Sequence, residues 1–554
     1  MSKYTIGVDF GTLSARALVA EIGTGRELAS AVMDYPHGVM TQSLPDGTPL
    51  RAGWALQHPS DYLECLQFTV REALSRSNVR PSDVVGLGVD FTADTFLPIG
   101  SDGEPLCLQP CWQSNPHAWV KLWKHHAAQP YATRMEAVAK ARGEQFLNRY
   151  GGKVSPEWMF PKLWQILDES PELYAAADRF IEAGDWIVLQ LTGAEARSAS
   201  IAGYKAFWHK RDGYPSQDYL RALDPRLANV ADEKLGRRLL PPGARAGALD
   251  RRGAALTGLP EGVAVAVANI DAHVAMPSVG LPAPGDMLMI LGTSACHIML
   301  GAEEQLVPGL CGAVEDGVIP GLVGYEAGQN CCGDHFQWIL ENLLPAHYER
   351  EAESQGCSLH ALLTEKAAAL RPGESGLLAL DWWNGNRSVL VDSDLSGLLV
   401  GMTLSTRPEE IYRALIEAVA FGARKIVETF EESGIAIGSL YACGGIALKN
   451  PLMMQILADV LHRQIHVARS TQAAALGSAM FGAVAAGKNA GGYDSIADAA
   501  REMGGVNDRS YTPIPENLPV YDALYREYSR LHDAFGRDGN SAMKQLRRIQ
   551  NGQR

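Results

Sequence analysis

Short apolar runs that end in glycine, hydroxyl-bearing or acidic residues recur along the chain. The β-branched run Val263–Val267 predicts a buried strand, and Asn269 and Asp271 follow it. Small residues from Ala272 to Gly280 then suit the start of a helix. Further strands are predicted at Lys3–Phe10, Arg16–Ile22, Glu27–Met33, Val84–Val89, Met287–Leu291 and Leu440–Cys443.

Segments with helical periodicity separate these strands. Pro408 in a first turn, with Glu409 and Glu410 at the positive end, marks the start of a helix. The tail beyond Pro515 is polar and is predicted to be a surface helix. Other helical patterns cover His58–Arg76, two stretches within residues 155–191, Asn450–Leu461 and the segment that begins at Ala475. The alternation of strands and helices is typical of an α/β protein.

The chain divides at one connector. Leu281–Asp286 contains two prolines and a glycine, a composition typical of a loop. Behind it, a strand, a hydroxyl-bearing turn and later helices repeat the order of the first half. We therefore expect two domains, residues 1–280 and residues 281–554, each long enough for its own core.

Two small turns are candidate phosphate loops. The first connects two predicted strands, so it is a hairpin rather than a Walker loop. Backbone N–H groups and hydroxyls in such a turn suit the outer phosphates of a nucleotide. The residues are Gly11, Thr12, Ser14 and the nearby Arg16 in the first turn, and Gly292 and Thr293 in the second. Asp9 ends the first strand and is a candidate for holding a metal-bound water, with an ordinary hairpin turn as the alternative.

Acidic residues at strand ends indicate a cleft. Asp271 is the candidate general base, because α/β folds place catalytic carboxylates at the ends of buried strands, and an ordinary surface aspartate is the alternative. Asp90 and Asp94 follow another predicted strand, and Glu326 lies between glycines. Lys205 has apolar neighbours, so its amine either extends to water or meets an oxygen-rich ligand.

Residues 112–126 are rich in tryptophan and histidine. One interpretation is a half-exposed helix that buries its tryptophans. The other is an aromatic wall, including Trp123, against a sugar, because an indole presents an apolar face to C–H groups. His125 and His126 are adjacent and cannot share one helix face, so no metal is assigned to them.

Composition excludes several classes of function. The net charge of −14 over 554 residues, without any basic run, argues against a nucleic-acid partner. No stretch of 18 apolar residues indicates a membrane span, and the first residues lack a signal sequence, so a cytoplasmic location is expected. Nine cysteines without a CxxC pair are expected to be reduced and mostly buried.

Five segments in order resemble the FGGY family of sugar kinases, which share the actin, hexokinase and Hsp70 ATPase fold. They are Gly7–Thr12, Asn269–His273, Leu291–Ser294, Ala418–Arg424, and Gly444–Gly445 with Asn450. The resemblance covers essentially the whole chain. It implies an α/β fold with two actin-like (ribonuclease H-like) ATPase domains and an active site in the cleft between them.

The resemblance also implies roles for individual residues. ATP and Mg²⁺ would be the cofactors, with Asp9 at the metal, Asp271 as the base, and the adenosine side at Gly444, Gly445 and Asn450. Three passages, Asp90–Thr95, Asn115–His126 and Gly203–His209, resemble the branch of the family that phosphorylates ribulose at O5 in L-arabinose breakdown. The implied sugar contacts are Ala93, Asp94, Trp123, Lys205, Asp271 and Glu326.

Other functions remain as alternatives. A kinase for another pentulose or a pentitol, such as xylulose or ribitol, fits the same family. An Hsp70-like machine would need a C-terminal client-binding β domain, which nothing after residue 500 resembles. A non-catalytic sugar sensor would be expected to lack Asp271 or Asp9, and both are present. The expected partners are the sugar and ATP, and a homodimer is compatible with the resemblance.

Overall fold

Two large mixed sheets organise the protein. The computed structural model describes residues 2–236 and 238–550, and within them the first sheet has seven strands, in the order β11-β12-β5-β1-β2-β3 with β13 beside β5. Its strands are β1 (Tyr4–Phe10), β2 (Ser14–Glu21), β3 (Glu27–Asp34), β5 (Val84–Phe91), β11 (Arg245–Ala248), β12 (Ala264–Ala266) and β13 (Asn269–Ile270). The predicted N-terminal hairpin is therefore confirmed.

The second sheet repeats the plan of the first. In both, the first strand pairs with an antiparallel second strand, which pairs with a third, and a later parallel strand lies on the other side of the first. In the described residues this sheet also has seven strands, in the order β16-β17-β15-β14-β20-β21-β22. They are β14 (Met287–Leu291), β15 (Ala295–Gly301), β16 (Gly312–Glu315), β17 (Val323–Gln329), β20 (Leu440–Cys443), β21 (Ile465–Ala468) and β22 (Val506–Tyr511). β14 and β20 coincide with the predicted runs.

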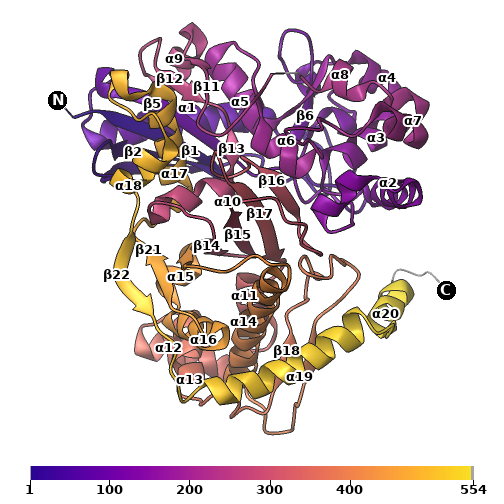
Figure 1. The fold of residues 1–554 in the computed structure, drawn as a ribbon, viewed down its shortest axis with the longest axis vertical. Coiled ribbons are helices and arrows are strands. Elements are labelled where there is room, and N and C mark those ends of the chain that lie inside the picture. Colours follow the sequence, from indigo (N-terminus) through magenta and orange to yellow (C-terminus); the bar gives the residue numbers. More distant parts are fainter. Residues whose placement is uncertain (1, 237, 551–554) are drawn as a thin grey trace.

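Helices cover both sheets and join them. Figure 1 shows the N-terminal half above and most of the C-terminal half below, with β14, β15, β16 and β17 near the middle. In the first half the helices are α1 (Pro59–Ser77), α2 (Gln129–Arg142), α3 (Met159–Glu169), α4 (Pro171–Ala176), α5 (Ala183–Thr192), α6 (Ala199–Lys205), α7 (Gln217–Leu223), α8 (Val230–Lys234), α9 (Arg251–Thr257) and α10 (Asp271–Val274). In the second they are α11 (Gly333–Asn342), α12 (Ala346–Gln355), α13 (Leu359–Ala368), α14 (Pro408–Glu432), α15 (Gly445–Lys449), α16 (Pro451–Leu461), α17 (Ala473–Ala486), α18 (Ile496–Met503), α19 (Leu518–Gly536) and α20 (Ala542–Gln550).

One late helix belongs to the core of the first sheet. α17 returns to the upper half, where it lies beside β1 and β5 (Figure 1). Glycines on the two strands make this close approach possible. A Cβ atom at Gly7, Gly86 or Gly88 would lie 1.8, 2.0 or 1.9 Å from backbone oxygens of α17. The small residues of α17 and these strand glycines therefore bring helix and sheet backbones into direct contact.

An aromatic region extends the first half. In the described chain it contains a four-stranded sheet. Its strands, in spatial order, are β4 (Leu56–Gln57), β7 (Val120–Lys121), β6 (Phe96–Ile99) and β8 (Arg179–Glu182). Of the two interpretations of residues 112–126, the half-exposed helix is wrong: turns, a short 3₁₀ helix at Pro116–Ala118 and β7 occupy this stretch. Trp119 is buried among other aromatic side chains. The Asn-Pro pair at 115–116 supplies a side-chain cap for a single turn only. The short, fully buried strand β7 follows it and lies between β4 and β6.

Two short sheets complete the strand set. One pairs β9 (Arg197–Ser198) with β10 (Leu239–Leu240), and the other pairs β18 (Leu378–Leu380) with β19 (Leu398–Val400).

The C-terminal tail is helical, as predicted, but α19 is more than a surface helix. Its Tyr521, Tyr525 and Tyr528 are buried in the core of the second sheet, because they recur every three to four residues and form one apolar stripe. No helix of the described residues is long and apolar enough to cross a membrane.

All nine cysteines lie in described residues and none forms a disulfide. Six are buried, namely Cys65, Cys107, Cys311, Cys331, Cys332 and Cys443, which confirms the expectation of mostly buried thiols. We therefore expect alkylation of the denatured, unreduced protein to add a label at every cysteine. Intact mass after labelling measures this, and a mass short by pairs of labels would reveal disulfides.

Candidate active site

The two predicted phosphate turns have the same local geometry. In the first, the Gly11 N–H donates to the Ser14 carbonyl at 3.0 Å, and in the second the Gly292 N–H donates to the Ser294 carbonyl at 3.0 Å. Each turn joins the first two strands of its own sheet. The repeated plan of the two sheets thus generates one hydroxyl-bearing hairpin in each half.

Neighbouring segments hold the carbonyl groups of both turns. The Tyr35 hydroxyl donates to the Gly11 carbonyl at 3.0 Å, and Gln57 Nε2 donates to the Thr12 carbonyl at 2.8 Å. In the second turn, N–H groups at the start of α11 donate to the carbonyls of Gly292 and Thr293, each at 2.9 Å. Because their carbonyls are engaged behind them, the turns are rigid supports for a ligand.

Three carboxylates gather at the edge of the first sheet. Asp9 and Asp90 are register partners on the parallel strands β1 and β5. Asn269 on β13 pairs with Asp90, and Asp271 begins α10 directly after β13. Since parallel strands end at the same edge of a sheet, the strand-end acids of the sequence converge there.

Burial and the closeness of other negative charges shift the pKa values of these acids. Burial raises the pKa of Asp9, although a hydrogen bond with Asp90 and the charge of Arg16 oppose it. Burial and then the charge of Asp9 hold the pKa of Asp90 well above its usual value. Burial, followed by Asp9, raises the pKa of Asp271 to about 7. A cation bound among these carboxylates would reverse part of these shifts.

Lys205 and Glu326 meet across the two halves of the protein. Lys205 ends α6 and Glu326 lies on β17, and Lys205 Nζ is 3.2 Å from Glu326 Oε2. Lys205 Nζ is also 3.7 Å from Asp94 Oδ2. The side chains of Lys205 and Glu326 are 6% and 3% exposed, so this ion pair is buried. The lysine therefore does not extend to water, which was one of its two interpretations.

Glu326 has two more cationic or basic neighbours. An Arg387 guanidinium nitrogen donates to Glu326 Oε1, and His273 Nε2 lies 3.2 Å from Oε2. Burial raises the pKa of Glu326, but Lys205, Arg387 and His273 outweigh it and leave the pKa well below the usual value. Burial lowers the pKa of Lys205, yet Glu326 and Asp94 outweigh it and leave that pKa above the usual value. Both groups of the pair are therefore charged at neutral pH.

Asp94 connects this cluster to the aromatic region. Its backbone is left-handed, with φ of 63°, and its carbonyl accepts from Lys162 Nζ at 2.6 Å. Burial raises the pKa of Asp94 to about 7, against the lowering effect of Lys205. Ala93 is buried next to it. Trp123 Nε1 donates to Thr12 Oγ1 at 3.1 Å, so Trp123 joins the candidate sugar side to the first phosphate turn.

The residues predicted to lie beside adenosine differ in the space around them. A Cβ atom on Gly444 would lie 2.5 Å from the Leu291 carbonyl oxygen, whereas a Cβ atom on Gly445 would meet nothing within 4 Å. Asn450 separates α15 from α16, which agrees with the helix predicted over Asn450–Leu461, and its Oδ1 caps α16 by accepting from the Met453 N–H at 3.0 Å. A role of Asn450 at a nucleotide remains a prediction, and the cap accounts for its local structure.

Sequence reasoning did not assign a role to Arg387 or His273. Arg387 lies in the segment between β18 and β19, inside an Asn-Arg-Ser triplet that has the pattern of a glycosylation acceptor. Asn386 and Ser388 of this triplet are buried. No spacing in the sequence relates Arg387 to Glu326, so only the fold reveals their contact. His273 follows Asp271 by two residues and was part of the motif without a function of its own.

Comparison with known proteins identifies the family to which this fold belongs. Models of the FGGY family of carbohydrate kinases match residues 4–277 (N-terminal domain) and residues 287–486 (C-terminal domain). The chain belongs to the FGGY family of carbohydrate kinases. This FGGY kinase is 56% identical over 546 residues to a protein named ribulokinase from Anoxybacillus flavithermus, covering 98% of this chain and 97% of that protein. It is 55% identical over 546 residues to the ribulokinase of Geobacillus thermodenitrificans, with the same coverage.

Solved structures of the family share the fold of this FGGY kinase. The crystal structure of xylulose kinase from Rhodospirillum rubrum superposes with a TM-score of 0.77 at 24% sequence identity, over 96% of this chain and 99% of that one. The expected two-domain, actin-like α/β architecture is confirmed.

Proposed function

We propose that this carbohydrate kinase transfers the γ-phosphoryl group of ATP to the O5 hydroxyl of ribulose, in the breakdown of L-arabinose. The relatives named ribulokinase, above 50% identical over nearly the whole chain, support this substrate. The observation that carries the proposal is the buried Lys205–Glu326 pair beside Asp94. These groups, a cation with acceptors on either side, suit a polyhydroxylated ligand with a carbonyl group.

In this proposal Asp271 accepts the proton of the attacking hydroxyl. It lies at the strand edge where the acids gather, and Lys205 reaches it electrostatically. Phosphoryl transfer has a loose transition state, so positioning of the hydroxyl matters more than a strong base. Lys205, Glu326 and Asp94 would hold the sugar, and the turns at Gly11 and Gly292 would hold the phosphates. A sugar that draws the two halves together would also exclude water that otherwise wastes ATP.

The acid cluster fits a magnesium ion. Its donors are all carboxylate oxygens, the ligands that Mg²⁺ prefers. Asp90 Oδ1 is buried, and no N–H group or hydroxyl of the described residues donates to it. Asp9 would hold Mg²⁺, directly or through water, with Asp90 behind it. The ion would neutralise phosphate charge in the transition state. Asp271, Lys205 and the phosphate turns would perform the remaining tasks.

Asp9→Asn should therefore impair turnover mainly through the metal. We expect a raised Mg²⁺ requirement and partial recovery of the rate at high Mg²⁺, because an amide retains one oxygen donor but loses the charge. Initial rates over a Mg²⁺ series measure this. A variant that loses ribulose binding while its Mg²⁺ dependence stays normal would contradict the assignment.

A panel of sugars tests the substrate. A site that hydrogen-bonds particular hydroxyls rejects analogues that lack or misplace them much more strongly than an apolar pocket does. We expect kcat/KM to be highest for ribulose, lower for ribitol, which lacks the carbonyl, lower for xylulose, which is inverted at C3, and lowest for glycerol. Coupled ADP release measures all four. Xylulose or glycerol matching ribulose would overturn the substrate and leave the family unchanged.

The cellular location and the domain boundary complete the proposal. A kinase that uses ATP and Mg²⁺ and has reduced thiols suits the cytoplasm, which the absence of disulfides among the nine cysteines supports. The domain boundary is proposed near residue 280, in the connector that leads from the first sheet to the second, with α17 returning to the core of the first domain.

A further inference from the structure

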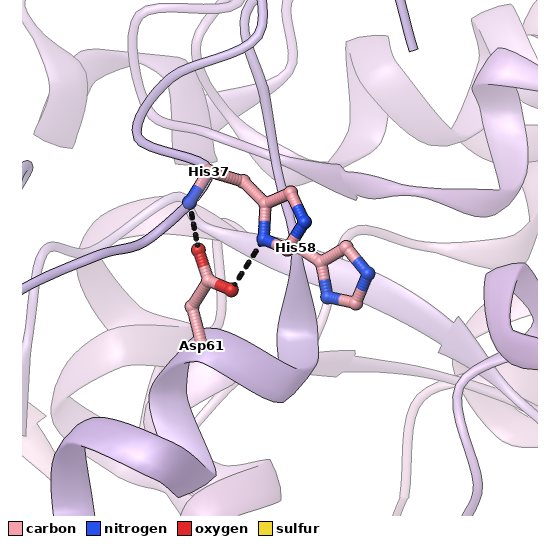
Figure 2. A group of neighbouring side chains, drawn as sticks. All are labelled: His37, His58 and Asp61. Carbon is pink, nitrogen blue, oxygen red and sulfur yellow. Dashed lines mark hydrogen bonds and ion pairs between the residues drawn. The ribbon is translucent and has the colours of Figure 1, made fainter. Parts of the chain in front are cut away.

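One group of three potential metal ligands in the described chain lies outside the residues assigned above. Figure 2 shows His37, His58 and Asp61 side by side. His37 follows β3, His58 is the residue before α1, and Asp61 lies in the first turn of α1. One ligand atom from each residue lies within 4.8 Å of the other two. We propose that this group binds a transition-metal ion such as Zn²⁺, separate from the magnesium site.

Asp61 orients His37. Its Oδ1 lies 2.7 Å from His37 Nδ1, and its Oδ2 accepts from the His37 backbone N–H at 2.9 Å. The Asp61 side chain is only 3% exposed, while that of His37 is 43% exposed. As a ligand, Asp61 would share the ion with this ring: the metal would take the place of the proton between His37 Nδ1 and Asp61 Oδ1. The backbone hydrogen bond to Oδ2 would keep the carboxylate in position.

His58 presents a second imidazole to the first. The two rings are stacked, with centroids 4.3 Å apart and planes inclined by 15°, so one ring has to rotate for the in-plane lone pairs of both to face one ion. His58 Nδ1 accepts from the Ser60 N–H at 3.2 Å, a long hydrogen bond that a metal can replace.

The donor set selects the class of ion. Two imidazole nitrogens and one carboxylate oxygen suit Zn²⁺, Co²⁺ or Ni²⁺, whereas Mg²⁺ prefers oxygen donors only. The exposed face of His37 leaves room for water in the remaining coordination position. The magnesium that accompanies ATP is therefore a poor competitor for this group.

The group lies where two supports of the first phosphate turn meet. The Tyr35 N–H donates to the Leu13 carbonyl at 2.9 Å, in addition to the bond from its hydroxyl to Gly11. Gln57, which donates to Thr12, accepts from the Tyr62 hydroxyl at 2.8 Å. His37 is two residues after Tyr35, His58 directly follows Gln57, and Asp61 directly precedes Tyr62. A metal that joins His37 to His58 and Asp61 would join these supports, and it would thereby restrain the turn that contains Gly11 and Thr12.

His58→Asn is the informative variant. Asparagine is a favourable N-cap, so it retains the capping role of His58 at α1 while removing the imidazole. His37→Gln removes the other ring. His347→Gln, which changes an exposed histidine on α12, is the control for non-specific binding.

Titration of the full-length protein with Zn²⁺ by calorimetry and with Co²⁺ by visible absorption tests the proposal without turnover. We expect one site per chain, weakened at least about 10-fold in His58→Asn and His37→Gln and unchanged in His347→Gln. Zn²⁺ should also change the KM for ATP in the wild type and not in His58→Asn. Equal affinity in His58→Asn and wild type, or no saturation below about 1 mM, would overturn the site. A KM shift that persists in His58→Asn would overturn its link to the phosphate turn.

Discussion

Replacement of Asp271 by asparagine is expected to lower kcat by at least about 10²-fold, the lower end of what a general base contributes. The change is conservative in shape, because the asparagine Oδ1 can still accept the Ala272 N–H that Asp271 Oδ1 accepts at 2.7 Å. The carboxylate charge is lost, and with it the ability to take up the proton. The KM for ribulose should change much less, since Lys205 and Glu326 remain in place. Steady-state kinetics with ribulose and ATP measure both constants.

A pH profile gives a second measure of the same role. Burial and the charge of Asp9 raise the pKa of Asp271 to about 7. A base acts in its deprotonated form, so kcat/KM for ribulose should rise as the pH increases through this pKa and level off above it. Mg²⁺ held at Asp9, as proposed, would cancel part of the repulsion from Asp9 and would move the rise to lower pH. The asparagine variant should lack the rise.

Asp34→Asn is the matched control. Asp34 also ends a strand of the first sheet, β3, but its side chain is exposed and outside the acid cluster. Its kinetics should stay close to those of the wild type. If Asp271→Asn turned over within a factor of a few of the wild type, another group would have to accept the proton.

Lys205→Met is expected to abolish measurable activity and to lower the free energy of unfolding by about 3 kcal/mol. Breaking a buried ion pair leaves an uncompensated charge, and about 3 kcal/mol is the lower end of that cost. The lower end applies because Arg387 and His273 still face Glu326. Methionine fills the volume of the lysine stem, so the loss comes from the charge rather than from a cavity. Denaturant unfolding and the ADP-release assay measure the two effects.

The double variant Lys205→Met/Glu326→Gln separates the two effects. Neutralising Glu326 removes the charge that lost its partner, so part of the stability should return. Activity should stay absent, because both proposed sugar contacts are gone. Lys210→Met removes an exposed lysine, 2.6 Å from Asp316, only five residues away. Exposed pairs contribute less than about 1 kcal/mol, so this control should be nearly as stable as the wild type. Equal destabilisation by both single changes would mean that burial of the Lys205 pair is energetically unimportant.

The sequence predicted the parts of the fold that depend on short-range patterns. Strands such as Met287–Leu291 and Leu440–Cys443 are continuous apolar runs bounded by turn residues, and they occur where predicted. The helix interpretation of residues 112–126 failed because their tryptophans pack against partners from several segments rather than along one helix face. Tyr521, Tyr525 and Tyr528 were assigned to a surface because most of their neighbours in the sequence are polar, although one face of α19 is buried.

The candidate site was predictable where its residues follow strands. Asp9, Asp90 and Asp271 end strands that become neighbours, so one rule about parallel sheets brings them together. Arg387 could not be predicted in this way. It reaches Glu326 from a loop 61 residues further along the chain, and nothing in either local pattern encodes that contact.

The packing of α17 has a consequence for the order in which the protein forms during synthesis. The strands Tyr4–Phe10 and Val84–Phe91 leave the ribosome early, but the helix that touches the backbones at Gly7, Gly86 and Gly88 is encoded at Ala473–Ala486. Until nearly the whole chain has been translated, one face of the first sheet lacks its helix and exposes glycine-lined backbone together with apolar neighbours. A nascent chain of this length is a natural client for chaperones. It also follows that a fragment ending at the connector is an incomplete folding unit, whatever the boundaries of its sequence motifs.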